Sequence, residues 1–300
     1  MSSSADAVQP RRGLARPARI GLLLAPALSV VGVLFVGGFA LGVAQSLGYQ
    51  PFLDGWRWST DAYTTAWQDP AVRASVGLTL RVSLLSTVGA TVLGVAAALL
   101  IHRTRRARRL LTAVFASPLP VPHVVGALTM LLLLSQSGLL SRVTHAAGVT
   151  GTPAEFPALT ADGFGVAIIA EYVWKETPFV GVVVLAALSA GVDELEDAAR
   201  TLGAGGLQRL RHVVLPLIAP SVAATSVLVF AFTFGSYEVP FLLGGPFPAA
   251  LPVVALQYHQ DVDLAARPEA MAISVVIAVL VAALVVVYLA TVDRFVRRVR

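Results

Sequence analysis

Residues 193–220 read DELEDAARTLGAGGLQRLRHVVLPLIAP, a polar stretch set between two long apolar runs. Its first half repeats apolar residues at the spacing of one helix face, with charged residues on the other faces. These apolar residues are Leu195, Ala198, Ala199 and Leu202. Gly203 then ends the helix, because glycine has low helix propensity and reaches positive φ, and a second periodic run follows. The stretch therefore predicts two short helices outside a membrane.

Glu196 and Arg200 stand four residues apart in the first of these helices. We expect them to form an exposed ion pair worth a few tenths of a kcal/mol, which supports the helix without fixing its position.

The composition excludes a soluble protein. Of the 300 residues, 56% are hydrophobic and 13% are charged, far from soluble averages. The basic residues lie in short blocks beside apolar runs, which favours orientation in a bilayer over nucleic-acid binding. There is no cysteine, and the five histidines share no ligand spacing, so we expect no metal site and no cofactor.

Six apolar runs are long enough to cross a bilayer as helices, and they predict an all-α membrane protein with six transmembrane helices. The runs are 20–47, 76–101, 110–134, 163–190, 218–243 and 270–292. Arg11 and Arg12 suggest a twin-arginine export signal as an alternative. However, the first run is too long for a signal peptide and lacks a clear cleavage site, so we expect a retained span.

The segments between the spans differ in charge. Sixteen arginines lie in the tail 1–19, in two alternate loops and in the tail 293–300, whereas the opposite segments hold four. This places both tails and the 193–220 stretch in the cytoplasm. The tail 1–19 is expected to be disordered. The outer loop 48–75 gathers three tryptophans, and Ser59, Thr60 and Asp61 offer N-caps for a short interfacial helix.

The 193–220 stretch also carries a family motif. The motif has the form E-A-A, three residues, G, nine residues, I-x-L-P, and it falls here on Asp197, Ala198, Ala199, Gly203, Val213, Leu215 and Pro216. Asp197 replaces Glu and Val213 replaces Ile. In this the chain resembles inner-membrane permease subunits of binding-protein-dependent ABC importers. The resemblance implies the type I importer transmembrane fold over 71–292, with 191–220 as the loop that docks a separate ATPase.

The resemblance also implies the partners and the mechanism. It implies ATP-binding cassette subunits, a second permease chain that is identical or different, an extracytoplasmic solute-binding protein, and alternating access driven by ATP. The sequence Gly235-Ser236-Tyr237-Glu238-Val239-Pro240 is similar to spermidine/putrescine-type permeases. This implies a polyamine-type solute, with sugar, iron, sulfate or another small solute as alternatives.

The chain is not expected to be an enzyme. Its one lysine, Lys175, does not belong to a phosphate-binding G-x-x-x-x-G-K-[ST] loop, and no nucleophile elbow or catalytic dyad appears. A secondary transporter or channel would also show six spans and membrane acids, but it would not need the 193–220 motif.

Four polar residues inside the spans are candidates for a substrate pathway: Glu171, Lys175, Tyr237 and Glu238. Charges at membrane depth are costly and need partners or water. Glu171 and Lys175 are four residues apart, so they either neutralise each other or line the pathway. Glu238 has no cation nearby in the sequence, and it serves either the pathway or a bond between helices. We expect Glu171 and Glu238 to face one water-accessible cavity.

Overall fold

The computed structural model describes residues 16–299 except 52, 54–55, 105 and 190, and it describes no side chains for 16–19 and 292–299. Most of the N-terminal tail and the side chains of the C-terminal tail therefore lie outside the described residues. The regular elements of the described residues are all helices, joined by turns and loops, which confirms the predicted all-α class.

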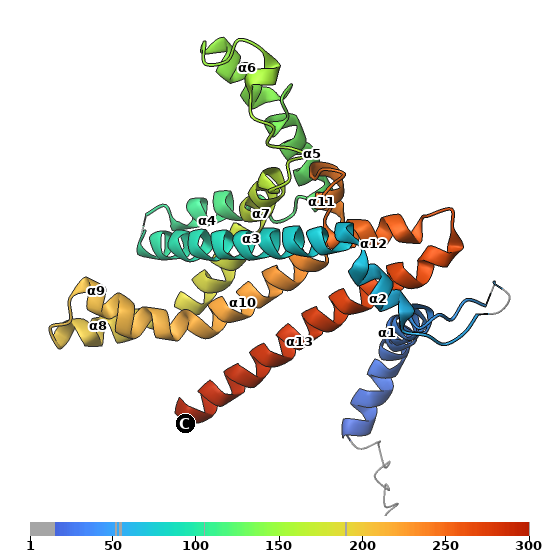
Figure 1. Cartoon of the computed structure of the whole chain (residues 1–300). Helices are drawn as coiled ribbons and strands as arrows, with labels where there is room; N and C mark the ends of the chain where they lie inside the picture. Colours follow the sequence, from blue (N-terminus) through green and yellow to red (C-terminus); the bar gives the residue numbers. More distant parts are fainter. Residues whose placement is uncertain (1–15, 52, 54–55, 105, 190, 300) are drawn as a thin grey trace, which may run out of the picture.

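The helices run in the following order (Figure 1). They are α1 Arg16–Ser46, α2 Asp61–Gln68, α3 Pro70–Arg103, α4 Arg108–Ala116, α5 His123–Leu134, α6 Leu139–Ala146, η1 Pro153–Glu155, α7 Val166–Leu188, α8 Val192–Thr201, α9 Gly206–Arg209, the π-helical η2 Leu210–Val214, α10 Leu215–Gly235, α11 Glu238–Leu243, α12 Leu251–His259, η3 Leu264–Ala266 and α13 Arg267–Val299.

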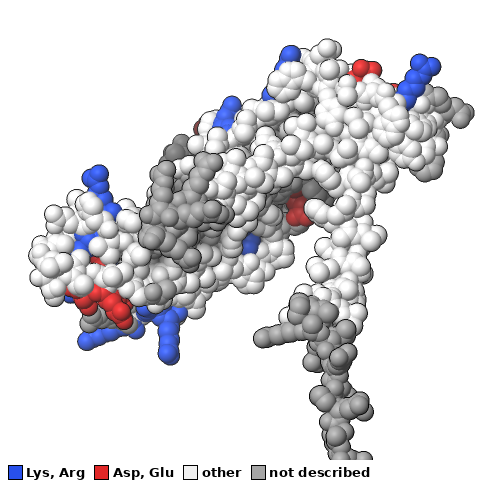
Figure 2. Space-filling model, turned by 90° about the horizontal axis from the view of Figure 1, so that it is seen from below, with Lys and Arg blue, Asp and Glu red and all other residues white. Residues whose placement is uncertain are grey.

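Five helices in the described chain are long and apolar enough to cross a membrane. A sixth is reached only if α7 and α8, which are bent by 59° at their junction, are taken as one. On the face drawn in Figure 2, most charged side chains lie toward two ends and few lie on the described surface between, which agrees with a spanning bundle.

The centre of the bundle is the packing of α3 against α7, with α10 beside both (Figure 1). Small residues allow it. A Cβ built on Gly94 would stand 2.8 Å from the carbonyl oxygen of Thr177, and one on Gly181 would stand 2.4 Å from the Phe115 ring. Glycine at both positions lets the helix backbones approach closely, as helix packing in lipid requires.

The third predicted run, 110–134, was wrong as one continuous helix. The chain forms α4, a turn and then α5. Pro118, Pro120 and Pro122 lie in the turn; each lacks an N–H group and fixes φ, so a helix cannot continue through all three. The apolar span is instead formed by α5 and α6, over His123–Ala146.

The fifth predicted run, 218–243, also divides. The long helix from Gly206 ends at Gly235, and α11 begins at Glu238. Residues 236–237 thus form a break between two helices. At its other end the helix continues through Pro216 and Pro220, both within α10, after the π-helical η2, which loosens the hydrogen-bond ladder just before the prolines.

The first helix is peripheral. It packs along α13, where a Cβ built on Gly42 would stand 3.9 Å from the Met271 sulfur. The Ser46 hydroxyl contacts the Tyr63 hydroxyl of α2 at 2.7 Å. Most apolar side chains of α1 are exposed, which suits a helix that faces lipid.

Candidate functional site

The helix α8 projects from one end of the bundle, joined to α9 and η2 (Figure 1). It lies between two glycines in the left-handed region, Gly191 at φ +107° and Gly203 at φ +84°. Its first residue, Val192, is buried in the core with residues of α3, α7 and α10. The rest of the helix is largely open to solvent.

An apolar stripe remains exposed on this otherwise charged helix. Leu195 is 49% exposed and Leu202, just after the helix, is 88% exposed. Ala198 is exposed and Ala199 is half-buried beside them. Exposed leucines on a polar helix mark a surface that fits another macromolecule better than water.

The predicted docking residues divide between two places. Asp197, Ala198, Ala199 and Gly203 lie on α8 and the turn that follows it, whereas Leu215 and Pro216 lie in the first turn of α10. All are exposed except the half-buried Ala199. The structure therefore places four of the six docking residues together at the projecting end. The last two lie farther along the continuous helix Gly206–Gly235, which α9 begins and α10 completes.

The predicted Glu196–Arg200 pair was wrong. Arg200 lies 3.2 Å from Asp197 on the same helix, and Glu196 lies 3.7 Å from the Nε of Arg209, which belongs to α9. The reason is that the chain turns back after α8, so that Arg209 of α9 lies against the half-buried face of α8 that carries Glu196. Glu196 therefore joins two helices instead of supporting one.

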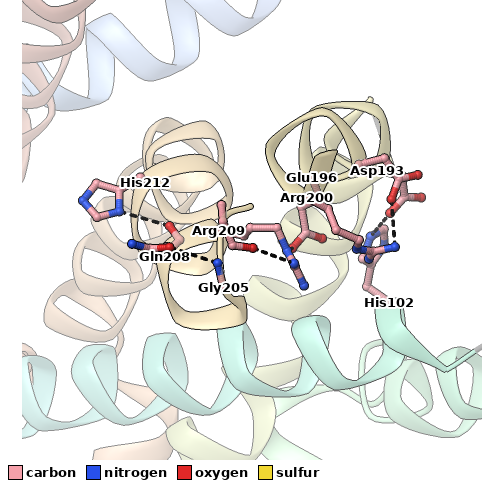
Figure 3. A network of polar contacts seen from close by, with 10 residues as sticks. His102, Asp193, Glu196, Arg200, Gly205, Gln208, Arg209 and His212 are labelled. Atoms are coloured by element: carbon pink, nitrogen blue, oxygen red, sulfur yellow. Dashed lines mark hydrogen bonds and ion pairs between the residues drawn. The ribbon is translucent and has the colours of Figure 1, made fainter. Parts of the chain in front are cut away.

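The turn between α8 and α9 is held by its own polar groups (Figure 3). Arg209 donates to the carbonyl of Ala204 at 3.0 Å, and the side-chain oxygen of Gln208 accepts from the Gly205 N–H at 2.9 Å. At the other end of α8, the His102 Nε2 lies 2.9 Å from Asp193 Oδ1. His102, Asp193 and Arg209 line a hollow of about 910 Å³, which has a mixed charged lining that includes residues of α3, α4, α8 and α9.

The membrane acids have different neighbours. One of the two interpretations expected Lys175 to pair with Glu171, and this was wrong. The Nζ of Lys175 instead donates to the carbonyls of Pro118 and Leu119 at 2.7 and 3.0 Å. The proline run explains this choice, since its missing N–H groups and broken helix leave carbonyls free at membrane depth. Lys175 therefore stabilises the turn between α4 and α5.

Glu171 is fully buried and faces His123. Its Oε1 lies 3.3 Å from His123 Nδ1, and the other imidazole nitrogen lies 3.5 Å from Glu176 Oε1. Neither Glu171 oxygen has a hydrogen-bond partner among the described residues. Phe232 of α10 covers the imidazole, with ring centroids 4.7 Å apart.

Glu238 and Tyr237 lie beside this cluster rather than in it. Both are exposed, and they line a hollow of about 390 Å³ with Ser236 and with Phe232 and other residues of α10. Phe232 thus stands between the hollow and His123. Glu171 does not line that hollow.

His102 and His123 were missed as site residues by reasoning on the sequence. Each had a usable signal: His102 directly follows the predicted span 76–101, and His123 follows the third proline of the run 118–122. Metal-ligand spacings cannot identify either residue, because their carboxylate partners come from distant segments: Asp193 for His102, and Glu171 and Glu176 for His123.

Comparisons with known proteins show to which family the chain is similar. The family described as binding-protein-dependent transport system inner membrane component matches residues 90–300. The trehalose/maltose transport system permease protein MalF of Thermococcus litoralis is 30% identical over 220 residues, which is 72% of each chain. The putrescine transport system permease protein PotI of Escherichia coli is 28% identical over 222 residues, 73% of this chain and 72% of that one.

A solved structure shares the fold. A chain of a bacterial ABC transporter involved in the import of the acidic polysaccharide alginate superposes with a TM-score of 0.75 at 21% identity, over 92% of this chain and 96% of that chain.

Proposed function

Because the chain belongs to the family of inner membrane components of binding-protein-dependent transport systems, we propose that α8 and the turn after it dock a separate ATPase subunit. The chain is a permease subunit of an ABC importer and not itself the ATPase. This membership favours the importer over the secondary transporter or channel that the spans alone allowed.

The proposal is supported above all by the exposed apolar stripe of α8. Leu202 and Leu195 lie at the projecting end among carboxylates and arginines, and Val192 anchors the helix in the core. A helix held at its base, with an uncovered apolar stripe, is suited to enter a groove on a partner. Docking would bury this stripe and pass movement of the partner to the bundle.

The test is transport by the complete complex reconstituted with its ATPase and binding protein. Ala199→Glu puts a charge on the stripe, and Gly203→Pro cannot keep φ at +84°, since proline fixes φ near −65°. We expect both variants to insert normally and to lose solute uptake coupled to ATP hydrolysis. Ala107→Glu is the matched control, because it adds the same charge to the neighbouring exposed turn before α4. Normal uptake in both α8 variants would contradict docking.

The remaining partners follow from the same membership. We propose that a second permease chain, identical or different, completes the pathway, that a solute-binding protein delivers the solute, and that ATP-driven rocking of the helices alternates access.

We also propose that both termini and α8 face the cytoplasm of a cell whose inner membrane holds the chain. Since the chain has no cysteine, Ser3→Cys and Thr60→Cys give unique labelling sites. An impermeant thiol reagent should label intact cells at position 60 and not at position 3, and the reverse pattern would contradict this topology.

A cationic, polyamine-type solute is the second proposal, and it is supported by acidic groups around Phe232. Glu171 and Glu176 are buried on one side of this ring, and Glu238 lines the hollow on the other. Lys175 supports the pathway indirectly through the α4–α5 turn. The names of the relatives cover a sugar, a polyamine and an acidic polysaccharide, so the charges of this chain carry the proposal.

Glu238→Gln tests the solute class, since it keeps the shape of the side chain and removes its charge. Uptake of putrescine by the complex should fall while the affinity of the binding protein stays unchanged. Tyr237→Phe, which keeps the ring and removes the hydroxyl, tests the other pathway candidate beside the same hollow. Uptake equal to wild type in Glu238→Gln would refute a charge role for this residue.

A further inference from the structure

The link between His102 and Asp193 joins two elements that have little other contact. His102 lies in the last turn of α3, and Asp193 lies in the first turn of α8. Their side chains meet at 2.9 Å (Figure 3). The backbone of α8 instead neighbours η2 and α9, which continue into α10. The imidazole is therefore the direct polar connection from the docking helix to α3.

The two side chains differ in freedom. The His102 side chain is 7% exposed, whereas that of Asp193 is 74% exposed. The imidazole is thus fixed by the protein around it, while the carboxylate is free to leave if α8 moves. The Nδ1 of His102 is buried without a hydrogen-bond partner among the described residues, so Asp193 is the polar group that holds the ring.

The helix α3 is the element best placed to receive a movement. It is 34 residues long and packs along most of α7, which carries Glu171 and Glu176, and it also packs against α10. A displacement at its His102 end therefore reaches the helices around Phe232. The second connection, Glu196 to Arg209 at 3.7 Å, leads from α8 into the α9–α10 helix.

We propose that His102 is a positioning residue for energy coupling: through Asp193 it transmits movement of α8 to α3. The proposal rests on docking of the ATPase at α8. The Asp193 carboxylate accepts the Nε2–H of His102, and the Glu196–Arg209 pair guides α10, so that one docking helix moves two spans together. Without the His102 link, α8 still docks and ATP is still hydrolysed, but α3 no longer follows.

The experiment measures solute transported per ATP hydrolysed by the reconstituted complex. His102→Leu and Asp193→Leu remove the hydrogen bond, whereas His102→Gln and Asp193→Asn retain a donor and an acceptor. We expect the two leucine variants to lower the ratio about three- to tenfold, the range that corresponds to loss of one hydrogen bond of typical net strength, with ATPase assembly unchanged. The two amide variants should restore most of the ratio, which a purely structural role of the ring would not produce.

The double variant separates the link from independent effects. His102→Leu with Asp193→Leu should lower the ratio no further than either single change, because each already breaks the same link. Arg103→Gln, which removes a charge from the lining of the same hollow, should leave the ratio unchanged.

Two results would overturn the proposal: a wild-type ratio in Asp193→Leu, or multiplied losses in the double variant. Asp193 is exposed, so its variants remain informative if His102→Leu fails to assemble. If Ala199→Glu also leaves coupling intact, then docking at α8 is wrong; if Ala199→Glu uncouples and Asp193→Leu does not, only the His102 link is wrong.

Discussion

Two groups of acidic side chains in this permease subunit have opposite surroundings. At the projecting end, Asp193, Asp197 and Glu196 each have a cationic or imidazole partner. Inside the bundle, Glu171 is fully buried, and its nearest cation candidate is an imidazole without hydrogen-bond geometry. The carboxylates at the projecting end have close partners, whereas the buried one has the His123 imidazole at 3.3 Å and no hydrogen bond among the described residues. Exposed pairs add little stability, so pairing at the projecting end mainly fixes geometry, whereas the buried acid depends on its few neighbours for stabilisation.

The largest expected loss of stability comes from removing Lys175, the cation inside the bundle that holds the turn between α4 and α5. Lys175→Met keeps the length of the side chain but leaves the carbonyls of Pro118 and Leu119 without their donor. We expect a loss of about 3 kcal/mol in the stability of the purified chain, since unsatisfied polar groups in lipid are costly. Thermal unfolding in detergent measures it. Arg81→Met is the control, because this exposed cation of α3 makes a longer bond of 3.3 Å to Gly163; equal losses in both variants would contradict the special role of Lys175.

The space around the buried acid gives the next effect. A Cβ on Gly126 would stand 2.7 Å from Glu171 Oε1 and 3.3 Å from the Trp174 ring. Gly126→Ala must therefore displace the carboxylate from His123, at a cost of about 1 to 2 kcal/mol. Gly77→Ala, which meets no atom within 4 Å, should be neutral or stabilising, because alanine favours helices. The difference in unfolding temperature between the two variants is the measurement, and its absence would show that Glu171 moves freely.

Another carboxylate, Asp69, lies just before the span that α3 forms and provides a pH test. Its Oδ2 accepts from the Tyr258 hydroxyl and its Oδ1 from the Ala71 N–H. These bonds, the first above all, hold the pKa of Asp69 below its ordinary value of 3.8. A lowered pKa in the folded state stabilises the fold above pH 3.8, and this contribution is lost as the pH falls through the folded pKa. Tyr258→Phe should flatten the acid limb of a pH series of unfolding temperatures; an unchanged limb would contradict this.

The smallest effect is expected at the exposed Asp197–Arg200 pair. Its two side chains are 69% and 64% exposed, so solvent screens the attraction, and Arg200→Gln should change stability by less than about 0.5 kcal/mol. Unfolding of the purified chain measures this change in stability. Arg211→Gln is the control, because Arg211 is an exposed arginine of η2. A loss of several kcal/mol would mean that the projecting end is held by its charges.

The sequence predicted what depends on local pattern. Apolar length gave the all-α membrane class, and the E-A-A spacing placed Asp197, Ala198, Ala199 and Gly203 on one projecting helix and turn. It failed where long-range contacts decide. Lys175 donates hydrogen bonds to carbonyls 56 and 57 positions away and not to Glu171 one turn away. Glu196 forms an ion pair with Arg209 and not with Arg200. Local charge spacing cannot rank such partners, because the fold brings the better one from elsewhere.

The backbone at Gly203 has a further consequence. Its φ is +84°, yet a Cβ placed there meets no atom within 4 Å, and the same is true of Gly191 at φ +107°. What these two positions require of the residue is a positive φ and not the lack of a side chain. L-alanine at either position should therefore be strained by about 1 to 2 kcal/mol through its backbone conformation alone. The helix between them is thus bounded by two residues at which backbone conformation, and not the surrounding space, favours glycine.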